Sequence, residues 1–510
     1  MAICAYQLRE HQEAIEYINL AINLAPDNPL YLAQFAQFLF TDNFELACEL
    51  FKKALKLSES QANDSDDSEK HQSSHKISRS FATLLYNQAC LEAKGINKQD
   101  QINAINIFKQ SLEYNPYNYK AYYNIACCYF NLDDLASGVE YIQRTLEINP
   151  DHSDSHFALS QFYQQNNIDQ GQMAEHHLQK ALEYKTLNLA AANYNYGVLE
   201  HQRGNYSQAI EHYQKSLEIH PESFAAAYNL GSVYQKLRDH QKAIEYYTQA
   251  SRINPNNETC KYLIASLKSG LNLDLNLEHN PNQAPTEYIE TLFDSYAKNF
   301  EDELINQLNY KTPELLYNLF IKYNKKNNLN ILDLGCGTGL IGQNFKPVTK
   351  TITGVDISQN MLGYAEQKNI YTKLVKSDIE QYLLSYSNSN SKFKFNLDSE
   401  KIDLIILADV LVYYGDLTSI FNNIHNNLAE SGYLLFSLES LESESESESE
   451  NYRLNNTGRY THNWNYVKRI LEPHYSVIVV KSTILRTQGE QQVSGVICLA
   501  RKNIIQEAHL

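Results

Sequence analysis

The sequence predicts a multidomain protein, with an all-α repeat array in the N-terminal half and an α/β domain in the C-terminal half. One observation is a series of Asn-Pro and His-Pro dipeptides that recur with a period of 34 residues. Another is the alternation of short apolar runs with helix-length segments in the second half. A glycine-rich loop, NILDLGCGTGLIG, ends the first of these runs. The length of 510 residues suits two or three domains.

Composition limits the possible classes of function. The chain has 43 Lys and Arg against 60 Asp and Glu and no basic run, so nucleic-acid binding is not expected. Its eight cysteines are scattered without a C-x-x-C pair, which argues against a zinc site or other metal centre and favours a reducing compartment. We expect a cytoplasmic protein, because the sequence shows neither a signal peptide nor a run of about 18 apolar residues.

The repeats have the length of tetratricopeptide units. Prolines 116 and 150 are 34 residues apart, and so are prolines 221 and 255. In the last unit, Gly231 and Ala243 allow two antiparallel helices to approach, Tyr247 fills the gap, and Pro255 stops the second helix. The preceding unit has the same pattern at Gly197, Ala209, Tyr213 and Pro221.

The whole array is expected to span residues 1–270. We expect six or seven helix pairs up to residue 255, then a capping helix over 256–270. Met1 falls at about the seventh position of its repeat, so either the chain begins earlier or the array starts with an incomplete unit. The polar segment 58–80 is expected to be a disordered insertion. The array is either a passive scaffold or a groove for a protein or peptide partner, and we favour the groove.

Seven apolar runs follow the linker 271–286 and a helical stretch. The first five are separated by helix-length segments, as in a parallel sheet with crossover helices, and the last two are close together, as at an antiparallel edge. The runs are NILDLG, TITGVDIS, TKLVKSDI, IDLIILADV, GYLLFSLES, YSVIVVKST and SGVICLARK. This domain is expected over 287–505, with solvated low-complexity insertions at 385–400 and 439–451.

Carboxylates end the first four strands, next to the glycine loop. They are Asp333, Asp356, Asp378 and Asp409, and the loop glycines are Gly335, Gly337 and Gly339. Ligands of such sheets bind at the carboxyl ends of the strands. The segment GTGLIG also matches the dinucleotide fingerprint, but Asp333 would repel a pyrophosphate. S-adenosylmethionine has no phosphate and carries a cationic amino group and a sulfonium, so it suits these carboxylates.

These residues resemble a class I S-adenosylmethionine-dependent methyltransferase. The resemblance rests on ILDLGCGTG, VDIS, SDI and ADVLVYYGDL, and it covers about 287–502. It implies a Rossmann-like domain with S-adenosyl-L-methionine as cofactor. The segments LFDSYAKNFEDELINQLNYKTPELL and LNNTGRYTHNWNYVKRIL further resemble predicted methyltransferases fused to tetratricopeptide repeats, in which the first segment forms a helical lid over the cofactor.

The resemblance assigns roles to residues of the cofactor site. Asp333 and the loop residues Gly335, Cys336, Gly337 and Gly339 are expected at the methionine end, with Cys336 as a small filler. Asp356 and Ile357 are expected at the ribose, Met361, Asp378 and Ile379 at the adenine, Asp409 near the sulfonium, and Tyr296 and Phe300 in the lid.

The acceptor side is expected at GRYTH, residues 458–462. Arg459 could bind an acceptor carboxylate bidentately, and His462 could accept a proton. A buried structural loop with a satisfied arginine fits equally well. Further candidates are Tyr413, Tyr414 and Asp416, with Tyr414 in a catalytic role and Tyr460 in acceptor binding.

Several functions remain open at this stage. The favoured function is methyl transfer to a small molecule or to a protein side chain presented by the array. A base is needed only if the acceptor is protonated at attack, and the acceptor atom is open among O, N, C and S. The alternatives are a repeat-based adaptor with a catalytically silent domain and a dinucleotide oxidoreductase.

Overall fold

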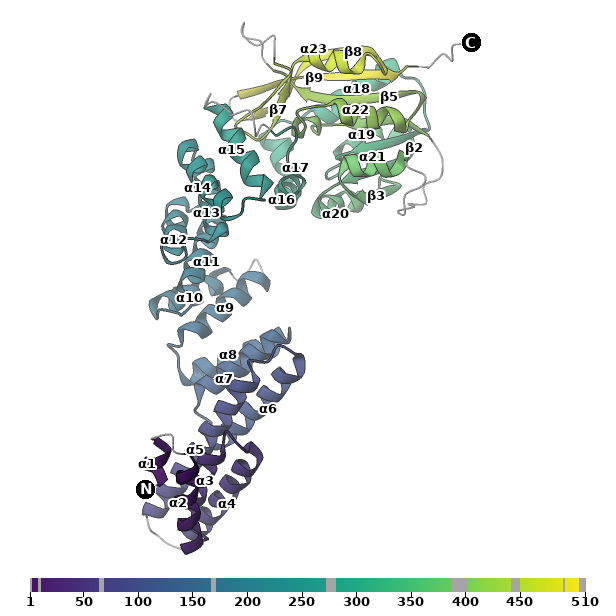
Figure 1. The fold of residues 1–510 in the computed structure, drawn as a ribbon. Coiled ribbons are helices and arrows are strands. Elements are labelled where there is room, and N and C mark those ends of the chain that lie inside the picture. Colours follow the sequence, from purple (N-terminus) through teal and green to yellow (C-terminus); the bar gives the residue numbers. More distant parts are fainter. Residues whose placement is uncertain are drawn as a thin grey trace. The chain divides into compact units, whose positions relative to one another are not determined.

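The computed structural model describes residues 2–7, 11–63, 68–166, 171–271, 281–387, 401–441, 450–488 and 491–503. They form two compact units, Met1–Pro221 and Glu222–Leu510 (Figure 1). The first unit consists of repeat helices, and the second combines the last repeat helices with the α/β domain. The division therefore falls within the array and not at the predicted linker 271–286, of which 272–280 lie outside the described residues.

The described residues of the array form seven helix pairs and a final single helix, in line with the predicted six or seven pairs and capping helix. In the first unit these are α1 (Ala2–Gln7), α2 (His11–Leu24), α3 (Pro29–Leu39), α4 (Phe44–Asn63), α5 (Ser68–Glu92), α6 (Lys98–Tyr114), α7 (Tyr119–Asn131), α8 (Leu135–Ile148), α9 (Ser153–Asn166), α10 (Gly171–Glu183), α11 (Leu189–Gln202) and α12 (Tyr206–Ile219). In the second unit they are α13 (Phe224–Lys236), α14 (His240–Ile253) and α15 (Glu258–Gly270).

The segment 58–80 is helical, so the prediction of a disordered insertion is wrong for its described part. It continues α4 as far as Asn63 and forms the first half of α5, and only 64–67 lie outside the described residues. A few buried apolar residues at helical spacing are enough to hold such a polar segment as a helix. The ring of Phe81 stacks on Phe51 with centroids 5.1 Å apart, and Ile77 is buried one turn earlier.

Close helix contacts explain the glycine and tyrosine pairs of the repeats, as predicted. A Cβ atom on Gly231 would lie 2.6 Å from Cδ1 of Tyr247, and one on Gly197 would lie 2.6 Å from Cδ1 of Tyr213. Both tyrosines are buried. The missing side chain of each glycine therefore provides the space for an aromatic ring of the second helix.

Gly231→Ala should destabilise the second unit by about 1–3 kcal/mol, because the new methyl group overpacks the contact with Tyr247. Thermal unfolding followed by calorimetry measures this. Gly363→Ala is the control, since a Cβ atom there meets nothing within 4 Å and alanine favours a helix by up to about 1 kcal/mol over glycine. A Gly231→Ala variant as stable as the wild type would contradict the packing.

The α/β domain contains a seven-stranded sheet with the order β3-β2-β1-β4-β5-β9-β8. The strands are β1 (Leu329–Leu334), β2 (Thr349–Asp356), β3 (Lys373–Lys376), β4 (Ile402–Leu407), β5 (Leu428–Glu439), β8 (Tyr475–Gln488) and β9 (Gln491–Lys502). The first five are parallel, and β9 and β8 add an antiparallel edge, which confirms the prediction. Since β1 lies between β2 and β4, the strand order reverses there, and this is where such sheets bind ligands.

Helices pack on both faces of this sheet (Figure 1). They are α16 (Thr286–Tyr296), α17 (Phe300–Asp302), α18 (Thr312–Tyr323), α19 (Leu340–Phe345), α20 (Gln359–Gln367), α21 (Ile379–Ser387), α22 (Thr418–Asn427) and α23 (Trp464–Leu471), with a π-helical turn at Glu303–Gln307 and 3-10 turns at Lys346–Val348 and Leu411–Tyr413. Alternate strand residues enter two cores: Leu332 and Ile405 belong to one, and Ile331 and Leu404 to the other.

A two-stranded hairpin, β6 (Tyr452–Leu454) and β7 (Tyr460–His462), connects the α/β domain to the array. The turn of this hairpin contacts α15. Tyr262 Oη donates to the carbonyl oxygen of Gly458 at 2.8 Å, Ser266 Oγ donates to that of Asn455, and the Gly458 N–H donates to Ser266 Oγ at 3.1 Å. These bonds explain why the last repeat helices belong to the second unit.

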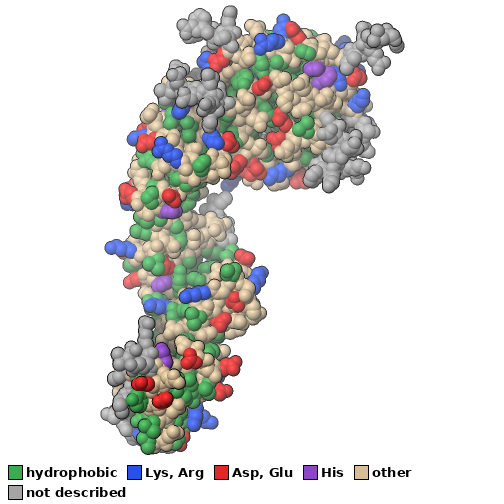
Figure 2. All heavy atoms as spheres, in the orientation of Figure 1, with side chains coloured by type: hydrophobic (Ala, Val, Ile, Leu, Met, Phe, Trp, Pro, Cys, Tyr) green, Lys and Arg blue, Asp and Glu red, His purple; other side chains and the backbone are tan. Residues whose placement is uncertain are grey.

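The surface shows no segregation of charge on the visible face. Acidic and basic side chains of the described residues are intermixed there with apolar ones (Figure 2). Among the described helices, none is both long and apolar enough to cross a membrane. The described residues likewise contain no group of three or more His, Cys, Asp or Glu placed to hold a metal ion.

Candidate functional site

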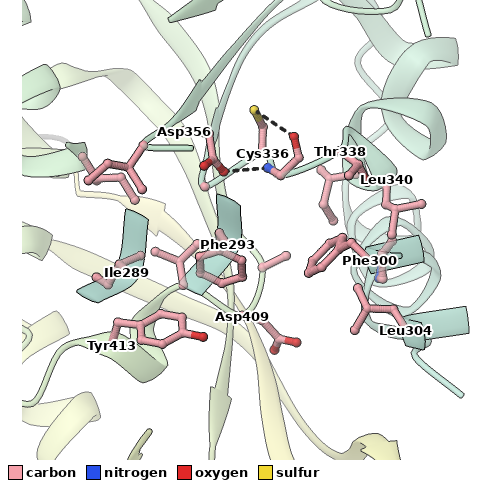
Figure 3. A pocket seen from close by; sticks show the side chains of 18 of the residues that line it. Ile289, Phe293, Phe300, Leu304, Cys336, Thr338, Leu340, Asp356, Asp409 and Tyr413 are labelled. Atoms are coloured by element: carbon pink, nitrogen blue, oxygen red, sulfur yellow. Dashed lines mark hydrogen bonds between the residues drawn. The ribbon is translucent and has the colours of Figure 1, made fainter. Parts of the chain in front are cut away.

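A cavity lies at the carboxyl ends of β1, β2 and β4, with about 1150 Å³ of empty space, part of it open to solvent. Most of the predicted site residues line it. They are Gly335, Cys336, Gly337, Asp356, Ile357, Asp378, Ile379, Asp409, Tyr413, Tyr414, Arg459 and Phe300. Asp356 and the glycine loop lie along one side of the cavity, and Asp409 and Tyr413 along the opposite side (Figure 3).

The glycine loop has a backbone that only glycine adopts readily. Gly335, Gly337 and Gly339 have φ angles of 71°, 51° and 89°. A Cβ atom on Gly335 would lie 2.3 Å from Val410 Cγ2, so the loop packs tightly on that side. A Cβ atom on Gly337 would instead lie 3.7 Å from Phe300 Cε1, a residue of the cavity wall. Glycine at this position therefore keeps the cavity free beside the loop.

The backbone N–H groups of Gly335, Cys336 and Gly337 already have acceptors. Gly335 and Cys336 donate to the carbonyl oxygen of Val355 at 2.8 and 3.1 Å, and Gly337 donates to Asp356 Oδ2 at 2.8 Å. A pyrophosphate at such a loop depends on free N–H donors. The arrangement therefore disfavours a dinucleotide.

Asp356 is the last residue of β2 and lies between the loop and the cavity. Its Oδ2 accepts the Gly337 N–H, and its Oδ1 accepts the Ser358 N–H at 2.9 Å. Burial raises the pKa of Asp356, and these backbone donors partly offset the shift. Each oxygen retains a lone pair with which it can accept a ligand hydroxyl.

Asp333 does not line the cavity, so the prediction of its direct contact with the ligand is not supported. It still belongs to β1, and it is completely buried. Tyr371 Oη donates to its Oδ2 at 2.6 Å, and its Oδ1 has no partner among the described residues. The ring of Tyr371 fills the space beside Gly339 and Gly354. The negative charge of the cavity wall comes from Asp356, Asp378 and Asp409 instead.

Asp333→Asn should stabilise the protein increasingly as the pH rises. Burial raises the pKa of Asp333 to about 7, so its contribution to the free energy of unfolding is present below about pH 4 and is lost as the pH rises through 7. Asparagine cannot ionise and still accepts the Tyr371 bond. The advantage of the variant should grow by on the order of 2 kcal/mol between pH 5 and pH 8 in denaturant unfolding. A constant difference over this range would refute the assignment.

Two further carboxylates that line the cavity belong to residues that follow the ends of strands. Asp378 follows β3, and its Oδ1 also accepts the Gln381 N–H at 3.1 Å, so it caps α21 as well. Asp409 follows β4 in the left-handed region, with φ 56°. Its N–H donates to Ser437 Oγ at 2.9 Å, and that hydroxyl donates back to Asp409 Oδ1 at 3.2 Å. Such strained backbone is typical of functional sites.

The predicted lid forms an apolar wall of the cavity. Ile289 and Phe293 of α16 lie one helical turn apart, and Phe300 and Leu304 follow. Tyr296 ends α16, is 44% exposed and does not line the cavity, contrary to the prediction. The sequence interpretation missed Phe293, although its spacing from Ile289 could have revealed it.

The acceptor side contains a buried ion network that the sequence interpretation missed. Glu439 Oε1 accepts from Arg459 Nε and from Arg486 Nη1, each at 2.7 Å. Arg459 Nη1 also donates to Tyr413 Oη at 3.2 Å. Burial alone would raise the pKa of Glu439, but the charges of the two arginines outweigh it and hold the pKa below its usual value.

The prediction that residues 439–451 form a solvated insertion is therefore wrong for Glu439. It is the last residue of β5, and 442–449 lie outside the described residues. At the other predicted insertion, 385–387 complete α21, and 388–400 lie outside the described residues.

Three predicted site residues besides Asp333 are buried away from the cavity. His462 is 3% exposed, and its Nε2 donates to the carbonyl oxygens of Tyr414 at 2.9 Å and Gly415 at 3.1 Å. Burial lowers its pKa to about 4, so the prediction of an acceptor-side base is not supported. Tyr460 Oη donates to the carbonyl oxygen of Pro281, and Met361 lies in the core.

The remaining predicted candidates lie nearby. Tyr414 lines the cavity, and its catalytic role stays a prediction. Asp416 accepts from Tyr466 Oη at 2.8 Å and from the Thr418 N–H at 2.9 Å, so it fixes the start of α22.

Comparison with known proteins gives two kinds of match. A family model described as "Methyltransferase domain" matches residues 325–475, and tetratricopeptide repeat models match 1–28, 102–162 and 188–256. The probable S-adenosylmethionine-dependent methyltransferase CRG1 of Saccharomyces cerevisiae is 27% identical over 139 residues, which are 27% of this chain and 45% of that protein. The chain spans 38% and 58% of two further curated relatives.

Two solved structures, one of a methyltransferase and one of a repeat protein, match parts of the chain. Magnesium protoporphyrin IX methyltransferase (ChlM) from Synechocystis PCC 6803 with bound SAH has 16% identity and a TM-score of 0.33, covering 43% of this chain and 99% of that one. YrrB, a TPR protein, has 21% identity and a TM-score of 0.30, covering 34% of this chain and 88% of that one. By the family models, the chain contains tetratricopeptide repeats within residues 1–256 and a methyltransferase domain over residues 325–475.

Proposed function

We propose that the protein transfers the methyl group of S-adenosyl-L-methionine to an acceptor. The observation that carries the proposal is the cavity at the reversal of strand order, where Asp356 and a glycine loop with occupied N–H groups form one side. The methyltransferase domain model matched to residues 325–475 supports it.

The residues of the cavity fit this cofactor. Asp356 can accept the two ribose hydroxyls, and Gly337 leaves space beside the loop. Thr338 Oγ1 is buried and has no partner among the described residues, although Thr338 lines the cavity, so it can bond a polar group of a ligand. Asp378 at the adjacent strand end can accept from an exocyclic amine.

When bound, S-adenosylmethionine supplies a methyl group whose bond to sulfur breaks as a bond to the acceptor forms, and the sulfur leaves as a neutral thioether. The chain's own part is alignment and exclusion of water. Asp409 places a negative charge near the expected position of the sulfonium, and Phe293 and Phe300 shield the cavity. A side chain that acts as base is not required unless the acceptor is protonated at attack.

The repeat array is proposed to bind a protein or peptide and to present it to the methyltransferase domain. Stacked repeats form the concave surfaces that such partners use. The contact of α15 with the 455–458 turn, which directly precedes Arg459, supports a role of the array close to the acceptor side.

Isothermal titration calorimetry of the full chain tests the proposal. S-adenosylmethionine and S-adenosylhomocysteine should each bind at one site, and NADH should not bind. Binding of NADH alone would revive the oxidoreductase alternative. Absence of binding by all three would favour an adaptor with a silent domain.

A further inference from the structure

We propose that Arg459 and Arg486 form a subsite of the cavity that binds a carboxylate group of the methyl acceptor. The inference rests on the proposed methyltransferase function and adds a chemical class of acceptor to it. The two arginines come from different elements, the hairpin turn before β7 and strand β8, and both line the cavity.

The two guanidinium groups share one protein carboxylate. Arg459 Nε and Arg486 Nη1 both donate to the same oxygen, Glu439 Oε1, at 2.7 Å. The side chains of Arg459, Arg486 and Glu439 are 18%, 9% and 6% exposed, so little solvent reaches them. One positive charge of the arginine pair therefore remains without a matching anion in this trio.

Arg459 also has a donor that is not used. Its Nη2 is buried and has no hydrogen-bond partner among the described residues, whereas its Nε and Nη1 bond Glu439 and Tyr413. Buried polar groups in folded proteins are normally bonded. A ligand oxygen in the cavity can supply the missing acceptor.

The charge on this side of the cavity selects a monoanion. Asp409 lines the same cavity and interacts electrostatically with Arg459, so the two arginines, Glu439 and Asp409 together are neutral. A monocarboxylate adds a single negative charge to this neutral group, beside a donor of Arg459 that has no partner among the described residues. A phosphate dianion would leave excess negative charge beside Asp409.

The shape and polarity of the cavity favour an acceptor that combines a carboxylate with an apolar group. Guanidinium donors form strong charge-assisted bonds to carboxylate oxygens, and Nη2 of Arg459 can make one such bond. Phe293, Phe300, Leu304 and Tyr413 supply an apolar and aromatic surface in the same cavity. An acceptor with an aromatic or aliphatic body and a carboxylate therefore fits better than a sugar or a polyamine.

Binding of 3-phenylpropanoate to the full chain saturated with S-adenosylhomocysteine tests the subsite, with 3-phenylpropanamide as the neutral match. We expect the acid to bind at least tenfold more tightly than the amide in ligand-detected NMR titrations. Arg459→Met should abolish this preference because it removes the Nη2 donor, while Glu439 keeps its bond to Arg486. Arg453→Met is the matched control, because Arg453 lies in the same hairpin, pairs with Glu450 and is 45% exposed.

The outcomes separate the subsite from the proposed function. Equal binding of acid and amide, no binding of either, or a preference that survives Arg459→Met would overturn the subsite while S-adenosylhomocysteine still binds. Failure of the wild type to bind S-adenosylhomocysteine would overturn the methyltransferase function itself. If Arg459→Met does not fold, Arg459→Lys takes its place. It keeps the charge but lacks the Nη2 donor, and it should lose at least threefold of the preference.

Discussion

Asp356→Ala should weaken the binding of S-adenosylmethionine by at least about a hundredfold. The carboxylate is expected to accept two ribose hydroxyls, and each charge-assisted bond contributes about 1.5–3 kcal/mol. The substitution also removes the acceptor of the Gly337 N–H, which holds the glycine loop against β2. Calorimetry with S-adenosylmethionine measures the loss.

The matched control is Asp403→Asn. Asp403 is also a strand aspartate that accepts a backbone N–H, from Asn330 at 3.0 Å, but it lies at the opposite end of β4 from the cavity. This variant should bind the cofactor like the wild type. If Asp356→Ala and Asp403→Asn lose affinity equally, the ribose assignment of Asp356 is wrong.

Glu439→Ala should destabilise the second unit by about 3–5 kcal/mol, because it leaves two guanidinium groups in a buried site without their carboxylate. The melting temperature should fall by roughly 5–15 °C. Differential scanning calorimetry of the full chain measures this. Glu439→Ala combined with Arg486→Met should recover part of the loss, since it removes one of the unpaired charges.

Glu450→Ala provides the comparison for an exposed ion pair. Glu450 bonds Arg453 at 2.5 Å, but both side chains are well exposed, at 39% and 45%, and such pairs contribute less than about 1 kcal/mol. A Glu439→Ala variant that melts like Glu450→Ala would show that the buried network does not stabilise the unit.

The sheet and the positions of its carboxylates could be predicted from the sequence because local patterns determine them. Consecutive strand residues such as Ile331 and Leu332 enter different cores. The polar residues Asp356, Asp378 and Asp409 stand where the apolar runs end. The repeat geometry was equally local, since Gly231 and Tyr247 lie within one unit.

Features that depend on distant contacts could not be predicted in this way. Whether Asp333 faces the cavity depends on β1 continuing to Leu334 and on Tyr371, 38 residues away. Arg486 reaches Glu439 because β8 pairs with β9 and β9 with β5. Glu439 adjoins an acidic low-complexity run in the sequence, and only the ladder with β9 shows that it ends a strand. His462 has the chemistry of a base, but its environment excludes that role.

The measurement that most directly tests the central claim is a crystal structure of the full chain with S-adenosylhomocysteine. We expect the ligand in the cavity, with its ribose hydroxyls on Asp356, its adenine near Asp378 and its sulfur on the side of Asp409. A ligand bound elsewhere, or an anion bonded to the N–H groups of Gly335 and Gly337 in its place, would contradict the account.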